Sequence, residues 1–122
     1  MNNVLLVNSI RKMLDIWEKV LTIEGVQLLL ATTLDETLSY LTNDEIKLII
    51  CSDTVLDTDT GEYVDCPDSL FENENSGKIP MIIVNTNSSS KPYQYSPSVL
   101  HVYDNQFIPS DMRALISEEL NI

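Results

Sequence analysis

The residues with the clearest potential for chemistry are polar side chains that directly follow short apolar runs. In chain order they are Asn8 and Ser9, Ser52 and Asp53, Asn85 and Thr86, and Asp104 and Asn105. In an open parallel α/β sheet, ligands bind outside the carboxyl ends of the strands. If the apolar runs are such strands, the Asp53 carboxylate and several amides and hydroxyls share one edge. There they could hold a cation or hydrogen-bond a small ligand.

The apolar runs have the form of buried strands. Each is short, continuous and rich in Val, Ile and Leu, which is typical of strands covered on both faces. They lie at residues 4–7, 26–31, 48–51, 81–84 and 99–103. Segments with helical spacing alternate with them. The pattern predicts a single α/β domain over residues 1–122, with a parallel sheet and helices on both faces.

Capping residues indicate where several helices begin and end. Ser9 is expected to cap the first helix, and Gly25 to follow its end. Thr33 and Glu36 form a capping box at the start of the second helix. Ser110 is expected to cap the last helix. These signals predict three helices of ordinary length.

Two other segments do not support full helices. Between residues 63 and 78, Pro67 and a polar tail leave room only for a short helix at 68–72. Between Asn85 and Ser98, three consecutive serines with Pro92 and Pro97 have the composition of a loop. The third helix is therefore expected to be short, and the fourth to be replaced by a loop.

Five short motifs are spread over the whole chain. They are Leu5 to Ser9, Leu48 to Asp53, Gly61, the segment Lys78 to Val84 with Ile79 and Pro80 before its strand, and Phe107 to Pro109. In this order they resemble the receiver domains of response regulators, and the resemblance covers the whole chain. The resemblance implies a CheY-like, flavodoxin-like doubly wound sheet of five parallel strands, in the order 2-1-3-4-5.

The resemblance also implies a phosphorylation site from which most of the chemistry is missing. Asp53 matches the aspartate that accepts the phosphoryl group. Asn8 and Ser9 stand where receivers carry two acids, Asn85 stands for a Ser/Thr hydroxyl, and Ile108 stands for a lysine. Mg²⁺ prefers carboxylates, so we expect its binding here to be weak or absent. The resemblance is therefore to degenerate, or pseudo-, receivers.

Asp53 also has interpretations in which it is not phosphorylated. A strand-end aspartate commonly caps backbone N–H groups in a turn, and we favour that role here. A third strand shorter by one residue would put Ser52 in the acceptor position instead. Nearby Asp57, Asp59 and Glu62 form a local acidic cluster with Asp53, which we interpret as a solvated loop that binds cations weakly if at all. No metal site is expected.

Tyrosines near the altered fourth helix suggest where a partner could bind. In receivers, the face formed by the fourth helix, fifth strand and fifth helix contacts partners. Tyr93, Tyr95 and Tyr103 lie in or beside this segment, and exposed tyrosines are common interface anchors. Alternatively, these rings cover the sheet edge that the missing helix would have covered.

Composition excludes several classes of function. With 19 acidic and 7 basic residues the net charge is −12, and there is no basic stripe of the kind that direct nucleic-acid binding needs. No apolar run approaches the roughly 20 residues of a membrane span, so we expect a cytoplasmic protein with no membrane partner. Cys51 is expected to be a buried thiol, with no disulfide to Cys66. These two cysteines and His101 have no zinc-site spacing.

Three functions are consistent with the sequence, and none of them is enzymatic. The first is a pseudo-receiver in signal transduction that binds a protein, such as a signalling protein or a histidine kinase, independently of phosphorylation. The second is an atypical phosphorelay receiver that is phosphorylated on Asp53. The third is a small-ligand binder that uses Asn8, Ser9, Asp53 and Asn85 at the strand ends. Homodimerisation is compatible with each of them.

Overall fold

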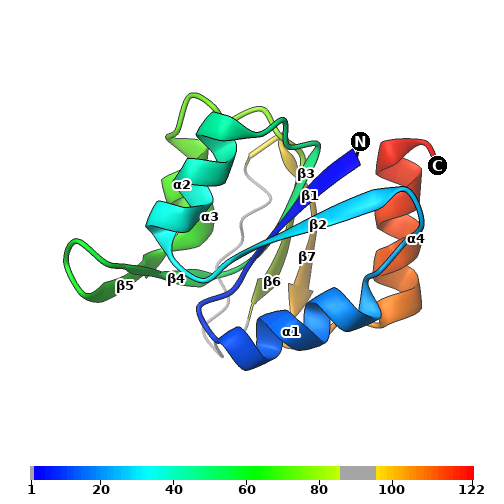
Figure 1. The fold of residues 1–122 in the computed structure, drawn as a ribbon, viewed down its shortest axis with the longest axis horizontal. Helices are drawn as coiled ribbons and strands as arrows, with labels where there is room; N and C mark the ends of the chain where they lie inside the picture. Colours follow the sequence, from blue (N-terminus) through cyan, green and yellow to red (C-terminus); the bar gives the residue numbers. More distant parts are fainter. Residues whose placement is uncertain (1, 86–95) are drawn as a thin grey trace.

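A parallel five-stranded sheet forms the centre of the molecule, in the order β2-β1-β3-β6-β7 (Figure 1). The structure is a computed structural model and describes residues 2–85 and 96–122. The five strands are β1 (Asn2–Val7), β2 (Val26–Ala31), β3 (Leu48–Ser52), β6 (Met81–Asn85) and β7 (Val99–Asp104). Counting only the five strands expected from the sequence, this order is 2-1-3-4-5, so the predicted fold class is confirmed.

The central strands form because their side chains are buried on both faces of the sheet. All five residues of β3 and of β6 are buried, as are residues 4–7 of β1. Edge strands β2 and β7 are only partly buried. At roughly 25 cal/mol per Å² of apolar surface removed from water, the continuous apolar runs strongly favour this central position.

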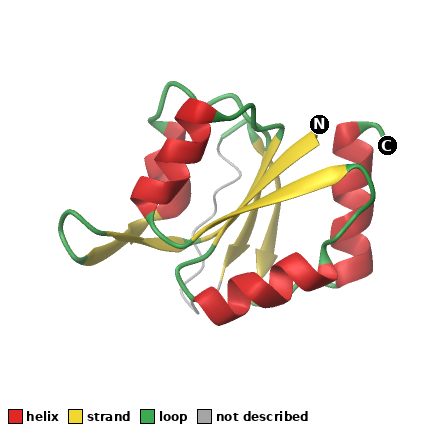
Figure 2. Ribbon diagram, in the orientation of Figure 1, coloured by secondary structure: helices red, strands yellow, loops and turns green. Residues whose placement is uncertain are grey.

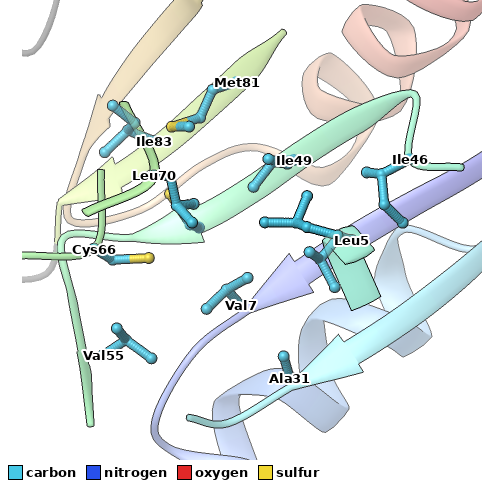
Figure 3. Close-up of a cluster of buried hydrophobic side chains, with 12 residues drawn as sticks. Leu5, Val7, Ala31, Ile46, Ile49, Val55, Cys66, Leu70, Met81 and Ile83 are labelled. Atoms are coloured by element: carbon cyan, nitrogen blue, oxygen red, sulfur yellow. The ribbon is translucent and has the colours of Figure 1, made fainter. Parts of the chain in front are cut away.

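Helices cover the two faces of the sheet and divide the core in two (Figure 2). The helices are α1 (Arg11–Val20), α2 (Leu34–Asn43), α3 (Cys66–Phe71) and α4 (Pro109–Leu120). One cluster lies under α1 and α4 and contains Trp17 and Met112. The other lies under α2 and α3 and contains Leu41 and Leu70; Figure 3 shows it in close-up. The expected short third helix is confirmed, since α3 has 6 residues.

The segment after β3 is not the solvated loop expected from its acidic sequence. It forms an antiparallel hairpin of β4 (Thr54–Asp57) and β5 (Glu62–Asp65). Val55 is fully buried in the core under α2 and α3, and this contact explains why an acidic segment becomes ordered. Gly61 closes the turn with φ 74°, a conformation that costs little for glycine.

Two of the predicted caps are wrong. Ile10, and not Ser9, is the N-cap of α1, and Ile108, and not Ser110, is the N-cap of α4. In neither helix does a side chain cap the first turn. Pro109 occupies the first position of α4, where its missing N–H costs nothing. Ser110, the predicted cap, is therefore the second residue of the helix.

Other predicted helix ends agree better with the structure. The Thr33 side chain accepts a hydrogen bond from the Glu36 N–H, which confirms the start of α2. The Glu36 carboxylate in turn accepts hydrogen bonds from the N–H and the hydroxyl of Thr32, the residue before the one that a capping box would use. By contrast, α1 ends at Val20, before the expected end, and Gly25 lies with φ 86° in the turn that precedes β2.

Both cysteines are fully buried free thiols, although Cys66 lies in a polar stretch of sequence. Cys51 lies on β3 and Cys66 begins α3. A hydrogen bond with Cys66, followed by burial, raises the pKa of the Cys51 thiol well above its ordinary value. The neutral thiol is thereby favoured, and Cys51 acts as a small apolar side chain in the core.

Two expectations concern residues 86–95. One is that a loop replaces the fourth helix, and the other concerns Tyr93 and Tyr95. Both fall on a segment outside the described residues. Among the helices in residues 2–85 and 96–122, none combines the length and apolar character that crossing a membrane requires.

Candidate functional site

Polar residues at the carboxyl ends of four parallel strands form one row. Val7 pairs with Cys51 and Ser52 pairs with Val84. Asp53, the residue after β3, therefore lies beside Asn85, the last residue of β6. The residues expected from the sequence to share an edge are thus brought together.

Burial distinguishes the members of this row. Asn8, Asp53 and Asn85 have exposed fractions of only 2%, 6% and 2%, whereas Asp104 is exposed. Three polar side chains therefore lie beneath the surface at the strand ends. Buried polar side chains in such a position need hydrogen-bond partners, and the partners of each define the site.

Asn8 is held by its backbone and by its side-chain oxygen. Its N–H donates to the carbonyl of Ala31 at 3.1 Å, and its Oδ1 accepts from the Ile10 N–H at 2.9 Å. Its Nδ2 is buried and has no hydrogen-bond partner in the described part of the chain. The bond from Ile10 sets the orientation of the amide, so an unpaired donor is left at the strand end. Ser9, beside it, is half-buried.

Asp53 is the first residue after β3. Its backbone carbonyl accepts from the Cys66 N–H at 2.9 Å, and the Ser52 hydroxyl donates to the Thr54 carbonyl at 2.7 Å. Ser52 is therefore the last strand residue, with its hydroxyl bonded within the turn. β3 thus ends at Ser52 and not one residue earlier, which is the strand length that the match of Asp53 to the family motif assumes.

The side chain beside Asn85 is the carboxylate of Asp104. It is neither a lysine nor Ile108, the residue that matches the family's lysine. Asn85 pairs with Asp104 across β6 and β7, and its Nδ2 donates to Asp104 Oδ1 at 3.4 Å. The Asn105 N–H donates to the Asn85 carbonyl at 2.6 Å, which extends the pairing beyond β7. The polar side chain that completes the row therefore comes from Asp104.

Ile108, which the family resemblance places in the pocket, lies outside this row of strand-end residues. It is the N-cap of α4, lies beyond the strand end and is 62% exposed. The place of Ile108 in the pocket rests on the motif of Ile108 and Pro109 alone and stays a prediction. Among the residues after the fifth apolar run, it is Asp104 whose side chain contacts Asn85.

Solved structures with the same architecture include receiver domains of response regulators. The receiver domain protein from Methanospirillum hungatei JF-1 matches with TM-score 0.80 at 18% identity, covering 99% of this chain and 94% of that one. A receiver domain protein from Clostridium thermocellum matches with TM-score 0.78 at 16% identity, covering 99% and 95%. The chain has the fold of a response-regulator receiver domain.

One further receiver structure was solved with its ligands. The response regulator protein TrrA from Thermotoga maritima, in complex with Mg²⁺ and BeF, matches with TM-score 0.75 at 13% identity, covering 98% of this chain and 99% of that one. No protein-family model matches the sequence. No curated protein matches it either. By comparison with known proteins, the similarity to these receivers is therefore detected from the three-dimensional structure, at 13–18% sequence identity, and not from the sequence.

The residues of this receiver fold do not fit Mg²⁺ in the way that the family resemblance implies. Asn8 and Ser9 carry no charge, and Asn8 Oδ1 is engaged by the Ile10 N–H. The remaining atom of the amide, Nδ2, is a donor and cannot coordinate a cation. What the strand ends offer instead is an unpaired amide donor and two carboxylates, on Asp53 and Asp104, that flank Asn85.

Tyr103 is the one described member of the three tyrosines expected at a partner surface. It is half-buried on β7 against the cluster under α1 and α4. Its ring makes edge contacts with His101 and Phe107, at centroid distances of 4.3 and 6.2 Å. Burial, and then the nearby Asp111 carboxylate, raise the pKa of the Tyr103 phenol above its ordinary value. The ring therefore both covers apolar surface and presents part of itself to solvent.

A separate acidic group lies at the hairpin. One carboxylate oxygen from each of Asp35, Asp57 and Asp59 lies within 4.8 Å of the other two, and the Thr58 hydroxyl donates to the Asp35 carboxylate. Sequence reasoning found Asp57 and Asp59 but missed Asp35, because α2 meets the hairpin only in the folded chain. Exposed acidic groups of this kind are common without a bound ion, and we assign no metal to them.

Proposed function

We propose that this chain is a pseudo-receiver module of signal transduction that binds a partner protein without being phosphorylated on Asp53. The observation that carries the proposal is the hydrogen bond from Asn85 to Asp104. It places a carboxylate at the end of the strand next to Asn85, where stabilising a phosphoryl group requires positive charge.

The electrostatic argument concerns charge neutralisation. Transfer of a phosphoryl group to Asp53 adds negative charge to a carboxylate that is already buried. With strands spaced about 4.8 Å apart, Asp104 lies two strands away from Asp53, at roughly 10 Å. Asn8 and Ser9 provide no carboxylate ligands for a compensating cation. The phosphorylated state is therefore disfavoured relative to that of a receiver with acids and a lysine in these positions.

The proposed interaction surface is the face formed by β7 and α4, with Tyr103 at its described part and Tyr93 and Tyr95 in the adjoining segment. Support comes from the partial exposure of the Tyr103 ring and from the exposed Leu100 on the same strand. Tyrosine side chains combine apolar area with a polar end and are frequent interface anchors. The partner is a signalling protein such as a histidine kinase. The module is cytoplasmic and not enzymatic, and it contacts neither nucleic acid nor membrane.

The test of this proposal is phosphorylation in vitro. The purified chain is incubated with acetyl phosphate and Mg²⁺, and in parallel with beryllofluoride and Mg²⁺, and is then followed by intact mass and amide NMR. We expect no covalent adduct and no shift of the amides around Asp53. A stable adduct that disappears in Asp53→Asn would overturn the proposal and establish a working phosphorelay receiver.

The partner surface requires a separate measurement. Tyr93→Ala and Tyr95→Ala should each weaken binding of the partner while circular dichroism shows an unchanged fold. Asp53→Asn is the matched control and should leave binding unchanged. Equal binding by all three variants would show that Tyr93 and Tyr95 do not anchor the partner.

A small-ligand function is a second candidate, and one observation favours it. The Asn8 Nδ2 donor is buried without a partner in residues 2–85 and 96–122, and an unmade buried hydrogen bond costs about 1–3 kcal/mol. A ligand with an acceptor atom would satisfy that donor. Thermal-shift screening of small metabolites separates this function from protein binding, since a true ligand should raise the melting temperature of the parent but not that of Asn8→Asp.

A further inference from the structure

The hairpin of β4 and β5 has one covered edge and one open edge. On the covered side, Leu56 of β4 forms a parallel bridge with Thr33, at the start of α2. On the other side, β5 has no neighbour among the strands of the described chain, because the small sheet contains only β4 and β5. Figure 1 shows the hairpin projecting from the body, on the opposite side from α4.

The pairing pattern indicates which backbone groups point outward from β5. Antiparallel pairs alternate between hydrogen-bonded and non-hydrogen-bonded. The Cys66 N–H bonds to the Asp53 carbonyl, just beyond the pair of Thr54 and Asp65. By alternation, Tyr63 lies in a non-hydrogen-bonded pair with Leu56, so its N–H and C=O face away from β4.

Tyr63 is also the most exposed large apolar side chain in the described part of the chain, with 64% of its surface accessible. The neighbouring Glu62 is exposed as well. An uncovered strand edge with an exposed aromatic side chain is a template for pairing with another chain. Natural proteins usually blunt such an edge with lysine or proline, and residues 54–65 contain neither.

The charge around this edge determines what can pair with it. Asp57, Asp59 and Glu62 lie on the hairpin, and Asp35 adjoins it from α2. Neither Lys nor Arg occurs at 54–65. A strand that pairs here meets several carboxylates and no compensating cation from the hairpin itself. A second copy of the chain would bring the same acidic edge and a net charge of −12, so like charges oppose self-pairing.

We propose that the open edge of β5 binds an extended, lysine- or arginine-containing segment of another protein, which adds to the hairpin as a third strand. Main-chain hydrogen bonds to Tyr63 provide the pairing, the Tyr63 ring packs on the added side chains, and the surrounding carboxylates select basic residues. This edge lies apart from the β7–α4 face, so the inference adds to the proposed function and does not rest on it.

The experiment uses the full chain labelled with ¹⁵N and a synthetic peptide that alternates lysine and valine. Amide shifts and hydrogen exchange are followed during titration. We expect the Tyr63 amide to shift and, with about nine-tenths of the protein bound, its exchange to slow about tenfold, because exchange then requires release of the peptide. A peptide with N-methyl groups that block strand pairing should not produce this protection.

Charge reversals test the selection of basic residues. Asp59→Lys with Glu62→Lys should weaken binding of the lysine peptide by about tenfold or more. Glu118→Lys with Glu119→Lys, at exposed positions of α4, changes the net charge equally and should leave binding within about twofold. A loss of the same size in both pairs would overturn the proposal, because it would show a response to net charge alone.

Other outcomes identify other occupants and also overturn the proposal. Protection of the Tyr63 amide that rises with protein concentration in the absence of peptide would indicate a second copy of this chain. Protection by Ca²⁺ alone would indicate a cation site at Asp35, Asp57 and Asp59. Binding of the peptide without any change at Tyr63 would place it elsewhere on the molecule.

Discussion

The side-chain amide of Asn85 donates a hydrogen bond to the carboxylate of Asp104, at 3.4 Å, where β6 and β7 end side by side. In the proposed function, this pair occupies the part of the strand-end row in which the negative charge of a phosphoryl group would have to be neutralised. Replacing the family's lysine by Ile108 would only remove a positive charge from the row. The Asp104 carboxylate in addition brings a negative charge. The relationship leads to a direct test by substitution.

Combining Asn8→Asp, Ser9→Asp and Asp104→Lys should convert the chain into one that accepts a phosphoryl group on Asp53 from acetyl phosphate in the presence of Mg²⁺. The two acids supply cation ligands, and the lysine supplies positive charge beside Asn85. Intact mass spectrometry measures the adduct. The same triple variant with Asp53→Asn is the control and should stay unmodified. A folded triple variant that gains no adduct would show that Asp104 does not occupy the position in which a lysine acts.

The Glu36 carboxylate should make the stability of the domain depend on pH at the acidic end. Hydrogen bonds from the side chain and backbone of Thr32 lower the Glu36 pKa below its ordinary value of 4.5. A depressed pKa in the folded state contributes stability above pH 4.5, and this contribution is lost as the pH falls through the folded pKa. Urea unfolding of Glu36→Gln between pH 3 and 7, a range of about four units around that transition, should show a weaker acid dependence than the parent.

The size of that effect is bounded by solvent exposure. Glu36 is exposed, so we expect its free-energy contribution at neutral pH to be below about 1 kcal/mol. Glu24, which is exposed and lies before β2, provides the control as Glu24→Gln. Parallel pH profiles for the parent and Glu36→Gln would show that the capping box does not hold the carboxylate in its charged form.

Arg113 should stabilise the domain far more than Arg11 does. Arg113 Nη1 donates to the Val20 carbonyl at 2.6 Å and so joins α4 to the end of α1. Hydrogen bonds of charged groups contribute about 1.5–3 kcal/mol. Arg113→Met should therefore lower the free energy of unfolding by about 1–3 kcal/mol, measured by urea denaturation.

The matched control is Arg11→Met, at the exposed ion pair with Asp15, which is 3.1 Å away on the same helix. Exposed pairs of this spacing contribute about 0.3–0.5 kcal/mol. Equal losses for the two methionine variants would contradict the structural role given to Arg113.

Gly61 should control the order of the hairpin. Its φ of 74° lies in the left-handed region, where a Cβ is strained although nothing lies within 4 Å of it. Gly61→Ala should therefore destabilise the hairpin by about 1 kcal/mol. Hydrogen exchange at Val64 reads out the opening of β4 from β5. Gly61→Asn is the control, because asparagine tolerates this conformation better than alanine does. If the Val64 amide exchanged more slowly in Gly61→Ala than in the parent, the left-handed conformation assigned to Gly61 would be contradicted.

Much of the fold could be predicted because its signals are local. Each central strand is a continuous apolar run, and such a run is stable only when both faces are covered, so β1, β3 and β6 were located within two residues of their observed ends. Thr33 and Glu36 marked the start of α2, since capping involves neighbours in sequence. Pro67 and the polar residues after it limited the length of α3. The same apolar runs predicted that Asp53 and the uncharged Asn8 lie at strand ends, because each lies just after its run.

The features that only the tertiary structure decided are all pairings between distant parts of the chain. Asp104 lies beside Asn85 because β6 and β7 align in one register, and a motif match at Ile108 and Pro109 could not reveal that register. Asp35 joins the hairpin carboxylates because α2 packs against β4. Cys66 is buried although its neighbours in sequence are polar. The hydrogen bond from the Cys66 N–H to the Asp53 carbonyl holds this first residue of α3 against the end of β3. Local sequence determines which segments become strands and helices, whereas the position of a side chain at a site depends on the packing of segments far apart in the chain.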